Sequence, residues 1–275
     1  MKPLRLLTCR DYPRGTQDDQ LLVEPLRRRG VAAEFVQWQH AGNSGIPHVL
    51  RSTWDYHNRI QEFQSALSAL PLVFNSLDTV NWNADKRYLS DLSAAGLPVV
   101  PTRFGSLPEL FSAAGDALYP CVVKPVGGAG GERTYRVQSS EQADLLLREP
   151  AAPETVWMRQ PYLEKVTTEG EISILIAGSE VSHAVVKRPA PGNFLVHQEH
   201  GGRTESCTVD GELARLSLAA LRAAPRPPVY ARVDWLFGPE GPLLAELELV
   251  EPDLYLLHNS AAADRFAEVF SQCAA

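Results

Sequence analysis

A lysine followed by a glycine-rich loop is the first feature of this sequence that could do chemistry. Lys124 ends the apolar run in CVVKPV, and four of the five residues after Val126 are glycines, namely Gly127, Gly128, Gly130 and Gly131. Glycines at this density let backbone N–H groups approach a phosphate closely, whereas a simple turn, the alternative, needs only one or two of them. The P-loop is excluded because its lysine follows the glycines, and the dinucleotide-binding GxGxxG pattern fails at Arg133.

Three carboxylates in the segment RVDWLFGPEGPLLAELELVEP (232–252) are the second such feature. If GPEGP is a five-residue loop, Asp234 lies opposite Glu246 and Arg232 lies opposite Glu248, all on one face of a hairpin. Clustered carboxylates repel one another unless a cation is present, and hard oxygen ligands suit Mg²⁺ together with nucleotide phosphates. The alternative is a solvated outer face, which is less favoured once the lysine loop is considered with the hairpin.

The first third of the chain must position these residues through alternating strands and helices. We expect strands at 4–9, 32–38, 48–54 and 71–76, and helices at 17–29, 59–70 and 84–96. This alternation predicts a small parallel sheet with helices on its faces. Asn83 is the predicted N-cap of the last of these helices, and Gly96 its end.

The rest of the chain predicts an antiparallel, α+β arrangement. Strands are expected in PCVVKPV, RTYRVQ and TVWMRQPYL, and helices at about 140–148 and 210–223. A first hairpin spans 171–188 and turns near Gly178, and the acidic segment forms a second. A boundary between the two kinds of structure falls near 97–105.

Composition limits the class of protein. The 275 residues carry a formal net charge of −7 with a sequence pI near 5.5, which argues against a nucleic-acid or anionic-membrane binder. The four cysteines form no CxxC pair, as expected for reduced thiols. The N-terminal apolar run is too short for a signal peptide, and no stretch approaches the ~20 apolar residues of a membrane span. We therefore expect a soluble, cytoplasmic protein.

The order of these features resembles the ATP-grasp superfamily of ATP-dependent ligases, from about residue 75 to 252. Lys86 and Lys124 match the two lysines that hold the α- and β-phosphates of ATP, and the glycine loop matches a lid. The adenine hinge matches RQPYL, with Gln160, Pro161, Tyr162 and Leu163. The resemblance also implies a ribose contact at Glu171, a phosphate-facing Arg232, and one or two Mg²⁺ ions (with Mn²⁺ as a substitute) on Asp234, Glu246 and Glu248.

Within the superfamily, the sequence is most similar to the small group that contains the D-cycloserine-forming O-ureido-D-serine cyclo-ligase. This likeness spans nearly the whole chain and includes RSTWDYH, FNSLDTVNWNADKRYL, SHAVVKRPAPGNF, EHGGR and ELELVEP. Glutathione synthetases and ribosomal-protein glutamate ligases are more distant relatives. The resemblance implies an ATP-grasp fold with an N-terminal α/β domain (1–96), a central lid (97–163) and a C-terminal catalytic part (164–275).

Two departures from the family pattern bear on the chemistry. Glu248 stands where related ligases usually have Asn, and the Pro-Gly turn that follows in them is absent, which favours the cyclo-ligase group over peptide-type ligation. Leu195 stands where relatives often carry an arginine. Lys187, Arg188 and Arg203 are the candidates to supply that charge, and with Arg232 they are the predicted catalytic cations.

The resemblance implies that a carboxylate of a small amino-acid-like substrate attacks the γ-phosphate of ATP, giving an acyl phosphate that a nitrogen then displaces. The C–N bond is either intramolecular or formed with a second molecule. A kinase and a nucleotide-binding protein without turnover are the alternatives of different class. Arg51, Ser52 and Asp55 lie at a predicted strand end where ligands bind, with a surface ion pair as the alternative for Arg51, and Trp54 is expected to pack. Relatives suggest a homodimer.

Overall fold

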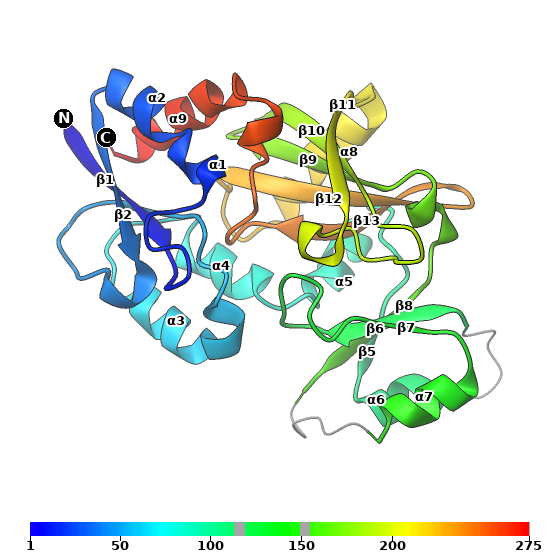
Figure 1. Ribbon diagram of the computed structural model, residues 1–275. Coiled ribbons are helices and arrows are strands. Elements are labelled where there is room, and N and C mark those ends of the chain that lie inside the picture. Colours follow the sequence, from blue (N-terminus) through cyan, green and yellow to red (C-terminus); the bar gives the residue numbers. More distant parts are fainter. Residues whose placement is uncertain (113–118, 149–154, 275) are drawn as a thin grey trace.

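The N-terminal part of the chain folds around a parallel sheet, as its alternating pattern predicts. The computed structural model describes residues 1–112, 119–148 and 155–274 (Figure 1). The parallel strands run in the order β2-β1-β3-β4 and comprise β1 (Lys2–Thr8), β2 (Val31–Gln37), β3 (His48–Leu50) and β4 (Val73–Phe74). The helices are α1 (Gln17–Gln20), α2 (Val23–Arg28), α3 (Ile60–Ser68), α4 (Leu77–Asn83) and α5 (Tyr88–Ala94).

Three predictions for this part are wrong in detail. The single helix expected over 17–29 is divided into α1 and α2. The strand expected over 48–54 ends at Leu50, so residues 51–54 lie beyond the sheet. Asn83 is the last residue of α4 rather than the N-cap of the next helix, because its amide is used by a distant strand, as described below. Gly96 does follow α5 in the left-handed conformation, as predicted for a residue that ends a helix.

A small antiparallel sheet follows and carries Lys124. Its strand order is β5-β8-β6-β7, with Lys124 near the end of β6 and the predicted hinge at the end of β8. Its strands are β5 (Arg103–Gly105), β6 (Cys121–Pro125), β7 (Tyr135–Val137) and β8 (Trp157–Pro161), and its helices are α6 (Leu107–Ser112) and α7 (Ser140–Leu146). This sheet lies apart from the parallel sheet and below the C-terminal one in Figure 1.

The larger antiparallel sheet contains both predicted hairpins. Its order is β11-β10-β9-β12-β13, and the first hairpin turns at Gly178 as expected. The elements are β9 (Glu171–Ala177), β10 (Glu180–Arg188), β11 (Arg203–Cys207), β12 (Tyr230–Gly238), β13 (Gly241–Glu248), α8 (Gly211–Ala220) and α9 (Ala262–Cys273). One parallel and two antiparallel sheets confirm the predicted combination of α/β and α+β structure. No helix among the described residues is long and apolar enough to cross a membrane.

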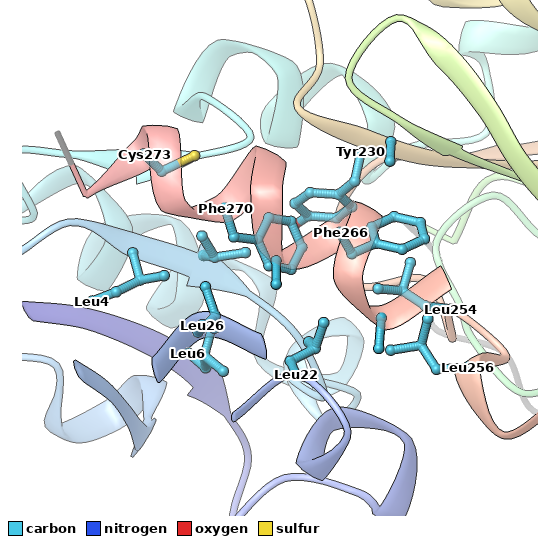
Figure 2. Packing of buried hydrophobic residues seen from close by; sticks show 14 of the residues in the cluster. Leu4, Leu6, Leu22, Leu26, Tyr230, Leu254, Leu256, Phe266, Phe270 and Cys273 are labelled. Carbon is cyan, nitrogen blue, oxygen red and sulfur yellow. The ribbon is translucent and has the colours of Figure 1, made fainter. Parts of the chain in front are cut away.

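A shared hydrophobic core joins the two ends of the chain. Helix α9 places Phe266 and Phe270 four residues apart on one face, and both are fully buried. Figure 2 shows these rings beside Tyr230 of β12 and near leucines of β1 and α2, such as Leu6 and Leu26. The last helix therefore fixes the parallel sheet against the C-terminal sheet.

Side chains from α4 and α5 cover the outer edge of β13. The Asn83 amide donates to the carbonyl oxygen of Leu247 (2.8 Å) and accepts from the N–H of Leu249 (2.7 Å), and the Tyr88 hydroxyl accepts from the N–H of Leu247 (3.0 Å). An uncovered strand edge would leave these backbone groups without partners in a buried setting. Asn83 therefore stabilises the strand that carries Glu246 and Glu248.

We expect Asn83→Ala to lower the free energy of unfolding by about 2–4 kcal/mol, because it leaves two backbone groups of β13 and its flank unsatisfied. Urea denaturation followed by circular dichroism measures the change. Asn81→Ala is the matched control, since Asn81 is exposed on the same helix. Equal losses in the two variants would contradict this role of the Asn83 amide.

Candidate active site

A pocket of about 590 Å³ collects most of the predicted site residues from all parts of the chain. Its walls come from the glycine loop, the hinge after β8, the pocket-facing sides of β9, β10, β12 and β13, and the N-terminal part. The predicted residues that line it are Lys86, Lys124, Gly128, Gly130, Gly131, Gln160, Pro161, Tyr162, Leu163, Glu171, Lys187, Arg232, Asp234, Glu246 and Glu248. Gly127 is exposed and does not line the pocket.

A bulge in β13 brings the three predicted carboxylates to one face. The hairpin turns through Pro239 and Glu240 alone, with Gly238 paired to Gly241, so the expected five-residue loop is wrong. If the pairing of Gly238 with Gly241 continued unchanged along the hairpin, Asp234 would lie opposite Ala245. The register shifts by one residue after Asp234, which restores its pairing with Glu246 and that of Arg232 with Glu248, as predicted.

The two predicted phosphate lysines both contact Glu246. Lys86 Nζ lies 2.8 Å from Glu246 Oε1, and Lys124 Nζ lies 3.5 Å from Glu246 Oε2. Burial opposes ionisation of this carboxyl group, but the ammonium groups of Lys124 and Lys86 hold the pKa of Glu246 well below its usual range. The carboxylate thus occupies the place between two lysines that an anionic ligand would compete for.

A second charge network surrounds Asp234. Arg232 Nε and Nη2 donate to its two oxygens at 3.0 Å each, and the Ser173 hydroxyl donates at 2.5 Å. Lys187 Nζ lies 3.7 Å from Asp234 and 2.5 Å from Glu171. Although burial works against the charged form, Arg232 and Lys187 lower the pKa of Asp234.

Glu248 completes this network at the edge of the pocket. Its carboxylate accepts from Arg232 Nη2. Burial nevertheless outweighs that guanidinium and raises the pKa of Glu248 to about 7. A divalent cation would relieve this unfavourable burial of negative charge.

The three predicted metal ligands suit Mg²⁺ in chemistry but do not converge on one point. Among the described residues, no three histidine, cysteine, aspartate or glutamate side chains form a ready metal cluster. Glu246 and Glu248 lie on one face of β13 and offer hard oxygen donors to the pocket, which fits Mg²⁺. Asp234 is 2% exposed and bonded to Arg232 and Ser173, so it would have to exchange partners to bind a metal.

The hinge end of the pocket is apolar. Val122, Tyr162, Phe194 and Leu236 line it, which suits a flat aromatic base. The N–H of Tyr162 already donates to the carbonyl oxygen of Pro120 (3.0 Å), so it is not free for a base. The carbonyl oxygen of Leu163 is likewise engaged, since it accepts from the N–H of Val166 (3.1 Å).

Two of the predicted catalytic cations lie outside the pocket. Lys187 faces inward from β10, so strand alternation turns Arg188 to the other side, where it pairs with the exposed Glu205 at 3.4 Å. Arg203 is exposed on β11, opposite Arg188. Leu195 lines the pocket beside Gly131, and among the three proposed substitutes for the family arginine, Lys187 alone lines it too.

The predicted substrate residues at the end of β3 do not line the pocket either. Arg51 is 2% exposed, with Nε 2.9 Å from Asp19 Oδ1 and Nη2 3.0 Å from the carbonyl oxygen of Pro252. It is therefore a buried ion pair rather than a surface one. Ser52 is buried, and Asp55 accepts from Trp38 Nε1 (2.6 Å) and the amide of Gln39 (3.0 Å).

Sequence reasoning missed the residues that reach the pocket from this side. They are Tyr12, Trp54 and His57 of the N-terminal part and Glu251, Asp253 and Tyr255 of the loop after β13. Trp54, expected only to pack, lies in the same RSTWDYH segment as Arg51, Ser52 and Asp55, and it lines the pocket whereas they do not. Burial and the nearby Glu248 raise the pKa of Glu251 to about 8. No strand pattern pointed to it, because β13 has ended before it.

Comparison with known proteins places this geometry in a family. The N-terminal domain of D-cycloserine synthetase matches residues 4–75, and the ATP-grasp domain of prokaryotic glutathione synthetase matches residues 100–221. The cycloserine biosynthesis protein DcsG of Streptomyces lavendulae is 30% identical over 91% of this chain and 92% of its own.

Solved structures agree in fold. The crystal structure of D-cycloserine synthetase DcsG superposes with a TM-score of 0.85 at 28% identity, covering 99% of this chain and all of the other. An ATP-grasp protein of Sphaerobacter thermophilus described as a RimK domain protein superposes at 0.72, with 18% identity over 97% of this chain and 98% of its own. The chain has the ATP-grasp fold and belongs to the ATP-grasp family of D-cycloserine synthetase.

Proposed function

We propose that this protein is an ATP-dependent ligase that activates the carboxylate of a small amino acid and forms a C–N bond, as an O-ureido-D-serine cyclo-ligase does in cycloserine biosynthesis. The observation that carries the proposal is the pairing of Lys86 and Lys124 with Glu246 in one pocket, next to Glu248. Lysines suit phosphate oxygens, and the glutamates suit the accompanying metal. The relationship to the cycloserine protein over 91% of the chain supports the same class of substrate.

ATP would lie along the pocket with its adenine between Tyr162, Phe194 and Leu236. Its phosphates would take the place of the Glu246 carboxylate at the two lysines. Mg²⁺ on Glu246 and Glu248, with Asp234 as a further ligand after release from Arg232, would neutralise charge on the β- and γ-phosphates. Arg232 and Lys187 are close enough to this point to stabilise the transferring phosphoryl group.

The reaction would proceed in two displacements. A carboxylate oxygen of the substrate attacks the γ-phosphorus, the bond to the β-phosphate oxygen breaks, and ADP leaves. A nitrogen then attacks the acyl carbon, phosphate departs, and the nitrogen loses its proton. In the cyclo-ligase reaction this nitrogen belongs to the same molecule, so the new bond closes a ring.

The glycine loop is held over the pocket in a way that suits a lid. Lys86 Nζ donates to the carbonyl oxygen of Gly128 (2.8 Å), and His57 Nε2 lies 3.3 Å from Glu132. His200 Nε2 lies 3.4 Å from the carbonyl oxygen of Gly130. A closed loop would exclude water, which otherwise hydrolyses an acyl phosphate.

Interception of the acyl phosphate tests the proposed chemistry. With O-ureido-D-serine we expect substrate-dependent ADP release. With O-methyl-D-serine, which lacks the attacking nitrogen, hydroxylamine should capture the activated carboxyl group as a hydroxamate, detected by its iron complex. ADP release with phosphate transferred to a hydroxyl group would indicate a kinase, and ATP binding without ADP release across amino-acid substrates would indicate a nucleotide-binding protein.

We expect Lys124→Ala to raise the Kd for MgATP about 10- to 100-fold, because a charge-assisted contact to phosphate contributes roughly 1.5–3 kcal/mol. Isothermal titration calorimetry measures the affinity. Lys165→Ala is the control, since Lys165 is exposed near the hinge and pairs only with Glu169 among the described residues. Unchanged affinity in Lys124→Ala would refute the phosphate contact.

We expect Glu246→Gln to lower Mg²⁺-dependent ADP release at least about 100-fold. Mutation of a residue that only hydrogen-bonds to a metal ligand already lowers metal affinity or activity about 10- to 100-fold, and Glu246 is a proposed ligand itself. A coupled assay over a Mg²⁺ titration follows the loss, and higher Mg²⁺ should restore part of it. Glu240→Gln, in the exposed turn of the same hairpin, should keep the wild-type rate. A wild-type Mg²⁺ dependence in Glu246→Gln would rule out this ligand.

A further inference from the structure

The lysine and arginine side chains that line the pocket are unevenly distributed along it. Lys86, Lys124, Lys187 and Arg232 gather at the end where phosphate transfer is proposed. The other end is formed by the N-terminal part and the loop after β13. Among the described residues that line the pocket, none that precedes Lys86 in the sequence is a lysine or arginine. Arg51, the cation expected on this side, is buried and bonded to Asp19 and to the carbonyl oxygen of Pro252. A substrate carboxylate therefore has cations to bind at the first end only.

At this second end, Glu251 differs from the other carboxylates of the pocket in its surroundings. It lines the pocket and is 8% exposed. Four other carboxylates of the pocket, Glu171, Asp234, Glu246 and Glu248, each lie within 4 Å of a lysine or arginine. Glu251 forms no such ion pair with any described residue, and burial favours the uncharged form of its carboxyl group. An ammonium group that enters the pocket would favour the ionised form of this carboxyl group.

The backbone around Glu251 is held from two sides. Trp54 Nε1 donates to the carbonyl oxygen of Glu251 (3.0 Å), and Arg51 Nη2 donates to that of Pro252 (3.0 Å). Tyr12 packs edge-to-face on Trp54, with ring centroids 5.0 Å apart, and both rings line the pocket. A fixed carboxylate beside aromatic walls is a setting that binds an ammonium group well.

We propose that Glu251 binds the α-ammonium group of the amino-acid substrate. The proposal rests on the proposed function, because the same molecule must turn its carboxylate toward Arg232 and Lys187. The two charged groups of an α-amino acid are attached to one carbon, so Glu251 and Arg232 would contact the same small part of the substrate. Arg51 and Trp54 are then positioning residues, which act on the substrate through the loop that carries Glu251.

Equilibrium binding separates this role from the chemistry. The protein is saturated with Mg²⁺ and a non-hydrolysable ATP analogue and titrated with O-ureido-D-serine or with 3-(ureidooxy)propanoate, which lacks the amino group. We expect the wild-type protein to bind the amino acid about 100-fold more tightly. In Glu251→Gln we expect this ratio to fall below about 5, through loss of amino-acid affinity, with the affinity for the ATP analogue unchanged.

Two further variants serve as controls. Glu199→Gln alters an exposed carboxylate at the rim of the same pocket and should keep the wild-type ratio. Trp54→Phe keeps an aromatic ring but loses the hydrogen bond to Glu251, and should reduce the ratio by a smaller factor. Glu251→Gln should melt no lower than the wild-type protein, because Glu251 has no ion pair with a described residue to lose and glutamine has nearly the same size.

Other outcomes would overturn the proposal. The proposal fails if the wild-type protein binds neither compound or binds both equally tightly. It also fails if Glu251→Gln keeps the wild-type ratio of the two affinities. An unchanged ratio with a raised Mg²⁺ requirement would assign Glu251 to the metal instead. If the amino-group preference holds while no ADP is released, the ligase proposal fails and the ammonium site stands.

Discussion

The structure depends on the mutual neutralisation of charges buried along the pocket. Glu246 lies between Lys86 and Lys124, and Asp234 is bonded to Arg232. None of these groups could be buried alone without a large loss of solvation. The same pairing would make the site responsive to ligand, because phosphate oxygens would compete for the lysines and a metal ion for the carboxylates. ATP and Mg²⁺ would therefore replace the internal ion pairs together, each compensating the charge that the other exposes.

The sheet around these charges explains why the hairpin has its unusual register. The tight turn at Pro239 and Glu240 would by itself put Glu246 on the apolar side of β13. The register shift beside Asp234 returns Glu246 to the pocket face and also lets Leu244 and Leu247 share the hydrophobic side with Trp235. The sequence prediction contained two errors that cancelled: the loop was taken as too long, and the bulge in β13 was not foreseen. The pairing of Asp234 with Glu246 was correct, although the five-residue loop assumed for it was wrong.

Features that depend on neighbouring residues, such as the face of a strand, were predicted correctly from the sequence. The roles of residues whose partners are distant in the sequence were predicted wrongly. Strand alternation was enough to put Arg232 and Asp234 on one face of β12, and the family pattern was enough to select Lys86, which lines the pocket. The role of Asn83 could not be read locally, because its partners Leu247 and Leu249 lie more than 160 residues away. Arg51 was assigned to substrate for the same reason: its pairing with Asp19 and Pro252 exists only once the N-terminal sheet has docked.

On binding, MgATP would take over the partners of the internal charge network formed by Lys86, Lys124, Glu246 and Glu248. The most direct measurement compares the Kd for ATP in Mg²⁺ with the Kd in EDTA by isothermal titration calorimetry. We predict at least about tenfold weaker binding without Mg²⁺, because phosphates would then face Glu246 and Glu248 with no metal between them. Equal affinity in the two conditions would contradict the claim, since it would mean that ATP binds without displacing these carboxylates.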